Sequence, residues 1–238
     1  MFQAKTSRLS CLGNGKGRHV KAAPSINRIP SPDWKHLMTN VLLALGANQT
    51  SRWGQPTQTF YHAVKQLDAI GVKLIQCSSI YRTAPTGCGL QPEFTNMAVR
   101  VSAHLSPNSL LKHIKILEIE TGRKMGQHWG SRPLDIDILD FSGFQTGWPP
   151  AELQQNARFQ GRRPRGRLIL PHPQLHLRSF VLFPLRDIAP HWRHPVFAVS
   201  VKRLIEQLLP ADRPAAGSAV APLRSIERLT TDLNWQKA

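Results

Sequence analysis

The sequence predicts an α+β protein in which helices pack on an antiparallel β-sheet. Short apolar runs typical of strands alternate with two segments whose apolar residues recur at helical spacing. Their order along the chain is β-α-β-β-α-β, the order of elements in a ferredoxin-like sheet with its helices on one face.

The first strand and helix lie near the start of the predicted domain. Residues 41–45 form a wholly apolar run that ends at Gly46, which predicts a buried strand. Pro56 suits the first turn of a helix, and the helix should end near Gly71. Its apolar residues recur at helical spacing: Ala63, Val64, Leu67 and Ile70.

The central elements follow in the same way. Residues 72–81 and 94–105 are expected to form the second and third strands, joined by a turn-rich stretch. Ser106 and the proline after it are typical of a helix N-cap and first turn, and this helix should stop at Gly122. Residues 134–141 give the fourth strand.

The rest of the domain is less regular. Residues 143–167 read as a polar, arginine-rich loop insertion, after which residues 168–170 are expected to return to the sheet. Helices are predicted near 178–185 and over 199–209. The chain thus divides into a basic, disordered extension over 1–38, a folded domain over 39–210 and a loose tail over 211–238.

The charge balance favours anionic partners. The chain has 238 residues, with 31 Lys and Arg against 14 Asp and Glu, and a formal net charge of +17. Nucleic acid, a membrane surface and phosphate-bearing small molecules would each suit it. Seven of these cations lie in the first 38 residues, against the single acidic residue Asp33. Such a basic segment would also fit a transit peptide, but we favour translation from Met38.

Cysteines and hydropathy indicate the compartment. Cys11, Cys77 and Cys88 show no metal-ligand spacing, and an odd number argues against a disulfide framework, so we expect a reducing cytoplasm. No apolar run approaches the roughly 20 residues that a membrane-spanning helix needs.

The sharpest local signal is the stretch 129–139, Trp-Gly-Ser-Arg-Pro-Leu-Asp-Ile-Asp-Ile-Leu. In a strand Asp135 and Asp137 share one face, about 7 Å apart, where they could bind a hard cation such as Mg²⁺ together with phosphates. A solvated strand face is the plainer interpretation, but Arg132 and Trp129 beside the pair favour a phosphate site.

Two further stretches could bind a substrate. Arg167, His172 and Arg178 could form a cationic clamp for a polyphosphate, or they could be a satisfied core histidine and solvated arginines. Residues 81–85 and 91–96 combine an aromatic ring with an amide and could hold a flat heterocycle, although alone they would read as an ordinary connection between strands.

Taken in order, these stretches resemble the motifs of the pterin pyrophosphokinase family over about residues 41–209. The motifs are Gly46-Ala47-Asn48, Tyr81-Arg82-Thr83-Ala84-Pro85, Pro92-Glu93-Phe94-Thr95-Asn96, Trp129 to Asp137, and Pro171-His172-Pro173 followed by Arg178-Ser179-Phe180-Val181-Leu182. Ala47, Ala84 and Pro133 depart from the usual residues, and His128 stands where the family commonly has arginine. A neutral histidine there should slow turnover or add pH dependence near neutrality.

The resemblance implies an enzyme that transfers diphosphate from ATP to the hydroxymethyl group of 6-hydroxymethyl-7,8-dihydropterin, releasing AMP, for folate biosynthesis. It implies two Mg²⁺ ions, a monomer, and neither a membrane nor a specific nucleic-acid partner. The implied catalytic residues are Arg123, Arg132, Asp135 and Asp137, with both aspartates as magnesium ligands. The implied ATP-binding residues are Glu118, Trp129, Arg167, His172 and Arg178. The implied pterin-binding residues are Thr83, Phe94, Asn96 and Phe180, with the ring between the two phenylalanines.

Two alternatives remain. A basic RNA-binding module can use the same sheet, but it usually displays aromatic residues on its central strands, where this sequence offers carboxylates that would repel phosphate. A degenerate family member kept for protein contacts would not need to retain Asp135, Asp137 and the basic residues around them.

Overall fold

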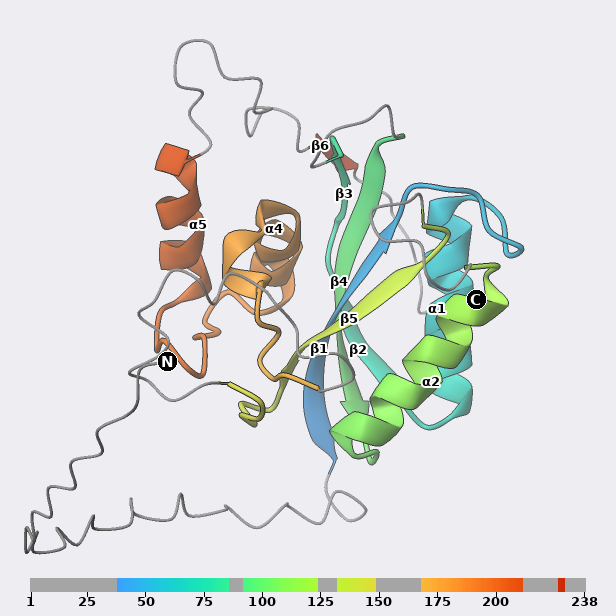
Figure 1. The fold of residues 1–238 in the computed structure, drawn as a ribbon, viewed down its shortest axis with the longest axis horizontal. Helices are drawn as coiled ribbons and strands as arrows, with labels where there is room; N and C mark the ends of the chain where they lie inside the picture. The colour runs from blue at the N-terminus through green and yellow to red at the C-terminus, as the bar shows by residue number, and fades with distance from the viewer. Residues whose placement is uncertain (1–37, 86–91, 124–131, 149–167, 212–226, 230–238) are drawn as a thin grey trace, which may run out of the picture. The chain divides into compact units, whose positions relative to one another are not determined.

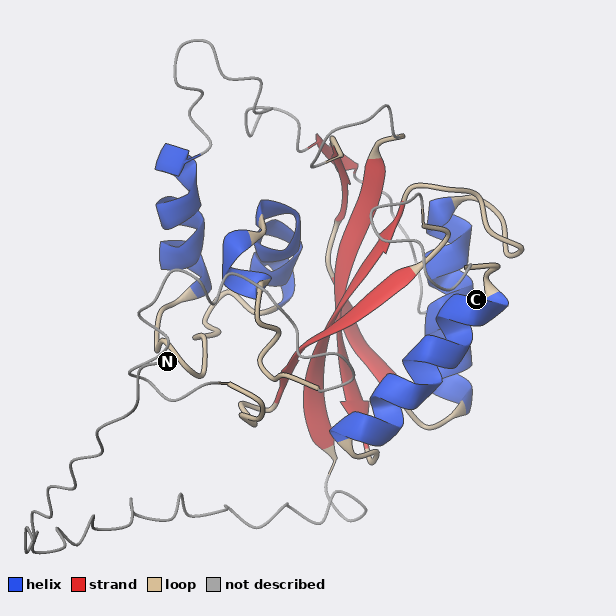
Figure 2. Cartoon of the chain, in the orientation of Figure 1, coloured by secondary structure: helices blue, strands red, loops and turns tan. Residues whose placement is uncertain are grey.

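The computed structural model describes residues 38–85, 92–123, 132–148, 168–211 and 227–229 (Figures 1 and 2). The elements are β1 (Thr39–Ala47), α1 (Pro56–Ala69), β2 (Lys73–Cys77), β3 (Ile80–Thr83), β4 (Phe94–Ala103), α2 (Pro107–Glu120), β5 (Asp135–Phe141), the 3₁₀ helix η2 (Leu175–Leu177), α4 (Ser179–Ile188), α5 (Val201–Ala211) and β6 (Glu227–Leu229). The strand order is β5-β1-β4-β3-β6, with β2 also pairing with β4, and all pairs are antiparallel. The predicted ferredoxin-like α+β class is confirmed.

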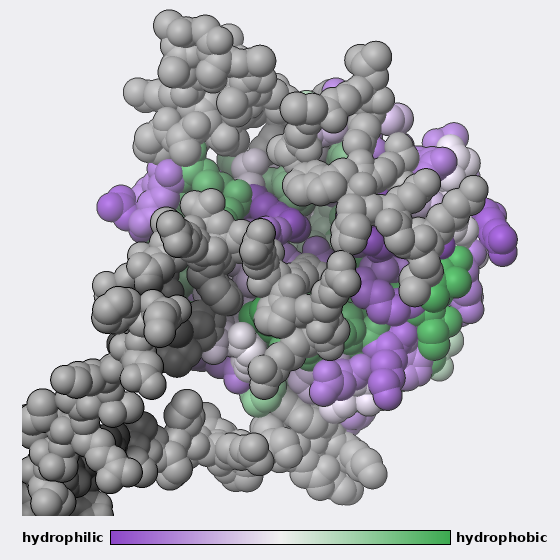
Figure 3. All heavy atoms as spheres, viewed as in Figure 1, coloured by the Kyte–Doolittle hydropathy of each residue, from purple (hydrophilic) through white to green (hydrophobic). Residues whose placement is uncertain are grey.

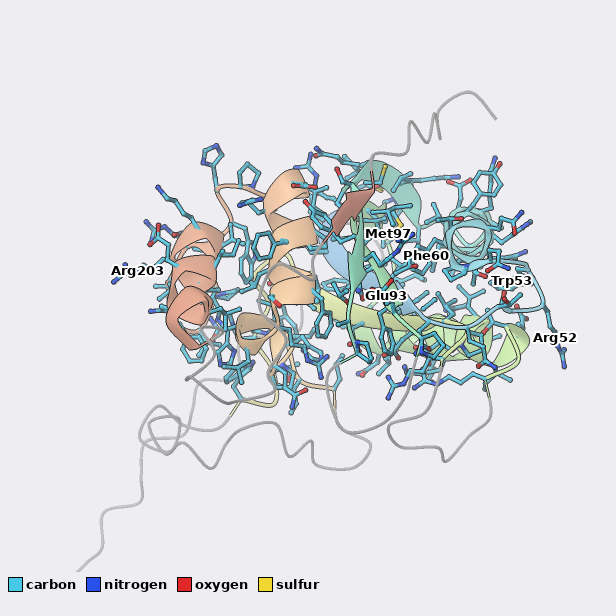
Figure 4. The ribbon with its side chains drawn as sticks, turned by 90° about the horizontal axis from the view of Figure 1, so that it is seen from above. Arg52, Trp53, Phe60, Glu93, Met97 and Arg203 are labelled. Carbon is cyan, nitrogen blue, oxygen red and sulfur yellow. The ribbon has the colours of Figure 1, made fainter. Side chains whose placement is uncertain are left out.

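Helices cover both faces of this sheet. Alternate residues of β1, among them Val41 and Leu43, belong to a core shared with α1 and α2, which includes Phe60 and Met97. Leu42 on the opposite face belongs to a second core formed with α4 and α5. Figure 4, seen from above, shows these layers on either side of the strands. The two expected helices do share one face, and α4 and α5 add a third layer.

The helix starts follow the sequence signals. The Ser106 side chain accepts a hydrogen bond from the Ser109 backbone N–H (3.2 Å), which satisfies one of the free donors at the start of α2. At α1 the backbone N–H of Gln55 donates to the Gln58 side chain at 2.9 Å, as in a capping box. Pro56 and Pro107 occupy first-turn positions.

The predicted second strand, 72–81, is wrong in one respect, because it is broken into β2 and β3. At the break, the Ser78 hydroxyl oxygen accepts the Ala98 N–H at 2.9 Å, in place of a backbone carbonyl. The next N–H, that of Ser79, leaves the ladder and donates to the Asp187 carboxylate of α4 at 3.1 Å. One serine hydroxyl and one carboxylate thus replace the strand partners that a continuous ladder would need.

Residues 168–170 do not return to the sheet, contrary to the prediction. Leu170 instead exchanges two backbone hydrogen bonds, both 2.9 Å, with Thr146 in an isolated bridge. A glycine is needed here, because a Cβ at Gly147 would lie 2.7 Å from the Leu168 carbonyl oxygen. Most of the 143–167 insertion lies outside the described residues.

The end of the chain also differs from expectation. The last helix runs to Ala211, two residues past the predicted end, and three residues of the expected loose tail form β6 beside β3. The remainder of that tail, like the predicted N-terminal extension up to residue 37, lies outside the described residues. Within the described parts, no helix is both long and apolar enough to cross a membrane.

The outer surface of α2 is partly apolar. Ile116 and Ile119 are 52% and 51% exposed, one turn apart on this helix. Figure 3 shows a hydrophobic area on the side of the molecule where Figure 1 places α2. The opposite side of the helix carries the core residues Leu110, Ile114 and Leu117.

Candidate active site

The candidate site lies on the sheet face that carries α4. The register places Asp135 of β5, Gly46 of β1 and Asn96 of β4 in one row across the sheet. The next row contains Asp137, Ala44 and Ala98. Between the aspartates and Asn96, the central strand therefore presents only glycine and alanine, so nothing larger than a methyl group rises from the sheet there.

Two arginines engage Asp135. Arg123, which follows α2, donates from Nη1 to Asp135 Oδ1 at 2.8 Å. Arg132, three residues before Asp135, donates to its other oxygen, Oδ2. All three side chains are about a quarter to a third exposed, so the cluster lies at the surface of the site rather than in the core.

A buried carboxylate orients one of these arginines. Glu118 is 2% exposed and accepts hydrogen bonds from Arg123 Nη1 (2.6 Å) and from the backbone N–H of Ile136 (3.0 Å). Burial raises the pKa of the Glu118 carboxyl, and Asp135 adds to this effect, while Lys115 opposes it. Burial alone would lower the pKa of the Arg123 guanidinium, but the charges of Glu118 and Asp135 outweigh it and raise that pKa.

Asp137 faces a second pair of basic residues. His172 Nε2 and Arg178 Nη1 each lie 3.7 Å from Asp137 Oδ2. His172 Nδ1 accepts the Gln174 backbone N–H at 3.2 Å, which places the proton of a neutral ring on Nε2, toward the carboxylate. The Gln174 side chain accepts a hydrogen bond from Arg178, which helps to hold that guanidinium in place.

The residues expected to bind the heterocycle lie on the other side of β1 from the two aspartates. Asn96 donates from Nδ2 to the Thr83 hydroxyl at 2.9 Å, and both side chains are buried. Phe94 lies opposite Thr83 in the β3–β4 ladder and is half-buried. Phe180, in the first turn of α4, packs partly on the second core, with the Arg178 guanidinium 5.6 Å from its ring centre.

Two residues with no predicted role belong to this site. Asn48 was named only as part of a motif, yet it is buried, and its side chain accepts a hydrogen bond from the Arg132 N–H (2.7 Å) and donates one to the Pro92 carbonyl (3.3 Å). Lys115 donates to both oxygens of Glu118, at 2.7 and 2.8 Å. Its position three residues before Glu118 on a helix was a usable signal.

The structure thus brings most of the predicted site residues onto one face of the sheet or its edge: Thr83, Phe94, Asn96, Glu118, Arg123, Arg132, Asp135, Asp137, His172, Arg178 and Phe180. Trp129, Arg167 and His128 lie outside the described residues.

The donor set fits magnesium only in combination with phosphate. Among the described residues, no group of three or more His, Cys, Asp or Glu side chains is arranged to hold a metal ion. Asp135 and Asp137 offer partly exposed carboxylates from one face, and Mg²⁺ commonly takes one or two carboxylates and completes its shell with water and substrate phosphates. The residues present fit such a metal–phosphate complex.

Comparison with known proteins gives consistent matches. Residues 42–190 match the family described as 7,8-dihydro-6-hydroxymethylpterin-pyrophosphokinase. The 2-amino-4-hydroxy-6-hydroxymethyldihydropteridine pyrophosphokinase of Synechocystis is 36% identical over 138 residues, which are 58% of this chain and 62% of that protein. Its namesake from Haemophilus influenzae is 32% identical over 153 residues, covering 64% of this chain and 82% of that protein. The match therefore spans less than two thirds of the Synechocystis protein.

Solved structures support the same fold. The wild-type HPPK-DHPS of Plasmodium falciparum aligns with a TM-score of 0.59 and 16% identity, covering 82% of this chain and 49% of that chain. At this identity the likeness shows a shared fold.

Proposed function

The chain belongs to the 7,8-dihydro-6-hydroxymethylpterin-pyrophosphokinase family, and we propose that it transfers diphosphate from ATP to the hydroxymethyl group of 6-hydroxymethyl-7,8-dihydropterin. The products would be AMP and the pterin diphosphate. The folded domain over 39–210 would carry this activity, acting as a monomer in the cytoplasm.

The observation that carries the proposal is the spacing of two kinds of group across the sheet. Asn96 and Thr83 offer amide and hydroxyl groups for a polar heterocycle, and Asp135 lies two strands away in the same row as Asn96. Neighbouring strands are about 4.8 Å apart, so these backbone positions are separated by roughly 10 Å. A pterin held by Asn96 would extend its hydroxymethyl arm over Gly46 toward phosphates bound at the carboxylates.

The basic residues would bind and orient the triphosphate. Arg123 and Arg132 flank Asp135, while His172 and Arg178 flank Asp137, so a chain of phosphates along β5 would meet cations on both sides. In the reaction, the pterin oxygen would form a bond to the β-phosphorus while the bond from that phosphorus to the α,β-bridging oxygen breaks. Oriented cations would stabilise the charge that develops on the phosphate oxygens.

Asp135 and Asp137 would hold magnesium. When bound, the metal would add positive charge at the phosphates beyond that of the arginines. Trp129 and Arg167 are proposed to close over ATP and to bind it, as the family resemblance implies.

We propose that Glu118 serves ATP indirectly. Its carboxylate is buried and already accepts hydrogen bonds from Lys115, Arg123 and a backbone N–H. A group so engaged would position the cations that touch the nucleotide. Phe94 and Phe180, which are partly exposed, would bracket the pterin ring.

The direct test is AMP formation from ATP and Mg²⁺, with and without 6-hydroxymethyl-7,8-dihydropterin. We expect pterin-dependent AMP from the native chain and a loss of at least about 10²-fold in Asp135→Ala and Asp137→Ala. The control is Asp68→Ala, which removes an exposed carboxylate of α1 that pairs with Lys73 outside the site. Folded protein that makes no pterin-dependent AMP would reject the proposal.

A further inference from the structure

We propose that Arg123 and Arg132 act as competitors of the divalent cation for Asp135, so that this carboxylate accepts the metal only when a triphosphate draws the arginines away. The inference rests on the proposed function, since it concerns how the nucleotide and its metal enter the same site. It assigns the two arginines a role before any chemistry takes place.

The geometry of Asp135 is the first observation. Each of its two oxygens accepts a hydrogen bond from a different guanidinium, Oδ1 from Arg123 at 2.8 Å and Oδ2 from Arg132. Paired guanidinium–carboxylate contacts of this kind are stronger than neutral hydrogen bonds. A metal ion that takes either oxygen must therefore displace a guanidinium or share the oxygen with it.

The surrounding charge is the second observation. Asp137, the other candidate ligand, has Arg178 and His172 within 3.7 Å on one of its oxygens. With Glu118 and Lys115 included, four cationic side chains surround three carboxylates in this cluster, before the histidine is counted. A divalent cation arriving alone would meet net positive charge, which opposes its binding.

A triphosphate changes this balance. Its negative charge offers the arginines new partners, and phosphate oxygens supply the ligands that two carboxylates cannot. Arg123 keeps a fixed anchor during such a move, because Glu118 holds the same nitrogen at 2.6 Å. Arg132 has its backbone fixed by Asn48 on both sides, so its side chain can turn without moving the strand.

The inference predicts that one substitution changes metal affinity in opposite directions. Without nucleotide, Arg132→Ala removes a competitor, so the affinity for Mn²⁺, used as a probe for Mg²⁺, should rise by about fivefold or more. With α,β-methylene-ATP present, the same variant lacks a phosphate partner, so Mn²⁺ affinity should fall by a similar factor. A purely structural loss would weaken binding under both conditions.

The experiment is a titration of the full chain with Mn²⁺, followed by the electron paramagnetic resonance signal of the free ion. The matched control is Arg203→Ala, which also removes an arginine from an ion pair, with Glu206, but on the exposed surface of α5 (Figure 4). It should match the native chain in both titrations. Asp135→Asn should weaken Mn²⁺ binding when the nucleotide is present and change it little when the nucleotide is absent.

The outcomes separate this inference from the proposed function. In one outcome, the native chain binds Mn²⁺ with the nucleotide, while Arg132→Ala without the nucleotide binds it as the native chain does or more weakly. That result would overturn the proposed competition between arginine and metal and leave the enzyme assignment intact. If the native chain binds no Mn²⁺ even with α,β-methylene-ATP, the proposed metal–nucleotide site itself fails. Opposite shifts in the two titrations are the expected result.

Discussion

Asn48 and Arg132 pair through both backbone and side chain: the Asn48 amide oxygen accepts the Arg132 N–H at 2.7 Å, and the Asn48 N–H donates to the Arg132 carbonyl at 3.0 Å. The same side chain donates to the Pro92 carbonyl. One short residue therefore connects the end of β1 to the segments that precede β4 and β5, which carry the proposed pterin and phosphate contacts.

Replacing Asn48 with alanine should damage the site more than the fold. The free energy of unfolding should fall by about 1–3 kcal/mol, because two side-chain hydrogen bonds in a buried setting are lost. We expect kcat/KM for both substrates to fall at least tenfold, since both segments lose a tether. Urea denaturation and steady-state kinetics would check this. Asn40→Ala, at an exposed position of β1, is the control, and equal kinetics in the two variants would contradict the assignment.

Gly46 should be needed for pterin binding in particular. A Cβ at this position would lie 3.2 Å from Asn96 Oδ1, closer than side chains normally approach. Gly46→Ala should push the Asn96 amide away from Thr83 and weaken pterin affinity about fivefold, the equivalent of one hydrogen bond. Calorimetric titration with pterin and with α,β-methylene-ATP would test this. Equal loss for both ligands would show general damage instead.

Asp187 should stabilise the broken strand through two donors. Its Oδ2 accepts the Tyr81 hydroxyl at 2.9 Å and the Ser79 N–H at 3.1 Å, which links α4 to the β2–β3 break. Tyr81→Phe should cost about 1 kcal/mol of unfolding free energy, and Asp187→Ala should cost more because it also leaves the Ser79 N–H without this acceptor. In a double-mutant cycle, the sum of the two single losses of unfolding free energy should exceed the loss measured for the double variant. Simple additivity would argue against the link.

His194 should make the fold sensitive to acid. It is fully buried, and burial, assisted by the neighbouring His176, lowers its pKa from 6.5 to about 3. Between these values the unfolded chain binds a proton that the folded chain does not. Stability is thus fully present above about pH 6.5 and falls by roughly 1.4 kcal/mol per pH unit as the pH drops toward 3.

His194→Asn is the informative variant, because an amide oxygen can replace Nδ1 as acceptor for the Val196 N–H but does not titrate. Thermal unfolding from pH 7 to 4 should show that stability falls less steeply with decreasing pH in this variant than in the native chain. His191→Asn, at an exposed position, should show the same dependence of stability on pH as the native chain. The same dependence in His194→Asn would refute the prediction.

Local sequence patterns predict most of the fold. Period-two alternation placed Asp135 and Asp137 on one face of β5, and the proline and serine signals marked the starts of α1 and α2. The wholly apolar run in β1 also indicates the third layer, because a strand without polar alternation is buried on both faces of its sheet. Leu42 and Leu43 do enter different cores.

The features that were predicted wrongly depend on contacts with residues distant in the sequence. The break at Ser79 involves Asp187, which is 108 residues away, and Leu170 pairs with Thr146 across the insertion. No local pattern reports such contacts. The role of Asn48 was missed for the same reason, because its hydrogen bonds join it to Pro92 and Arg132, 44 and 84 residues further on.

The bulge in β5 has a consequence for how this gene can change length. Leu43 pairs with Ile138 and Leu42 with Asp140, so Leu139 is the extra residue. A codon lost between Asp135 and Ile138 would shift the register by one residue on one side of the deletion, so the two carboxylates could no longer both face the substrates. Loss of Leu139 itself would instead give regular pairing and leave both carboxylates facing as they do now. In-frame deletions that preserve catalysis are therefore confined, within this strand, to the bulge.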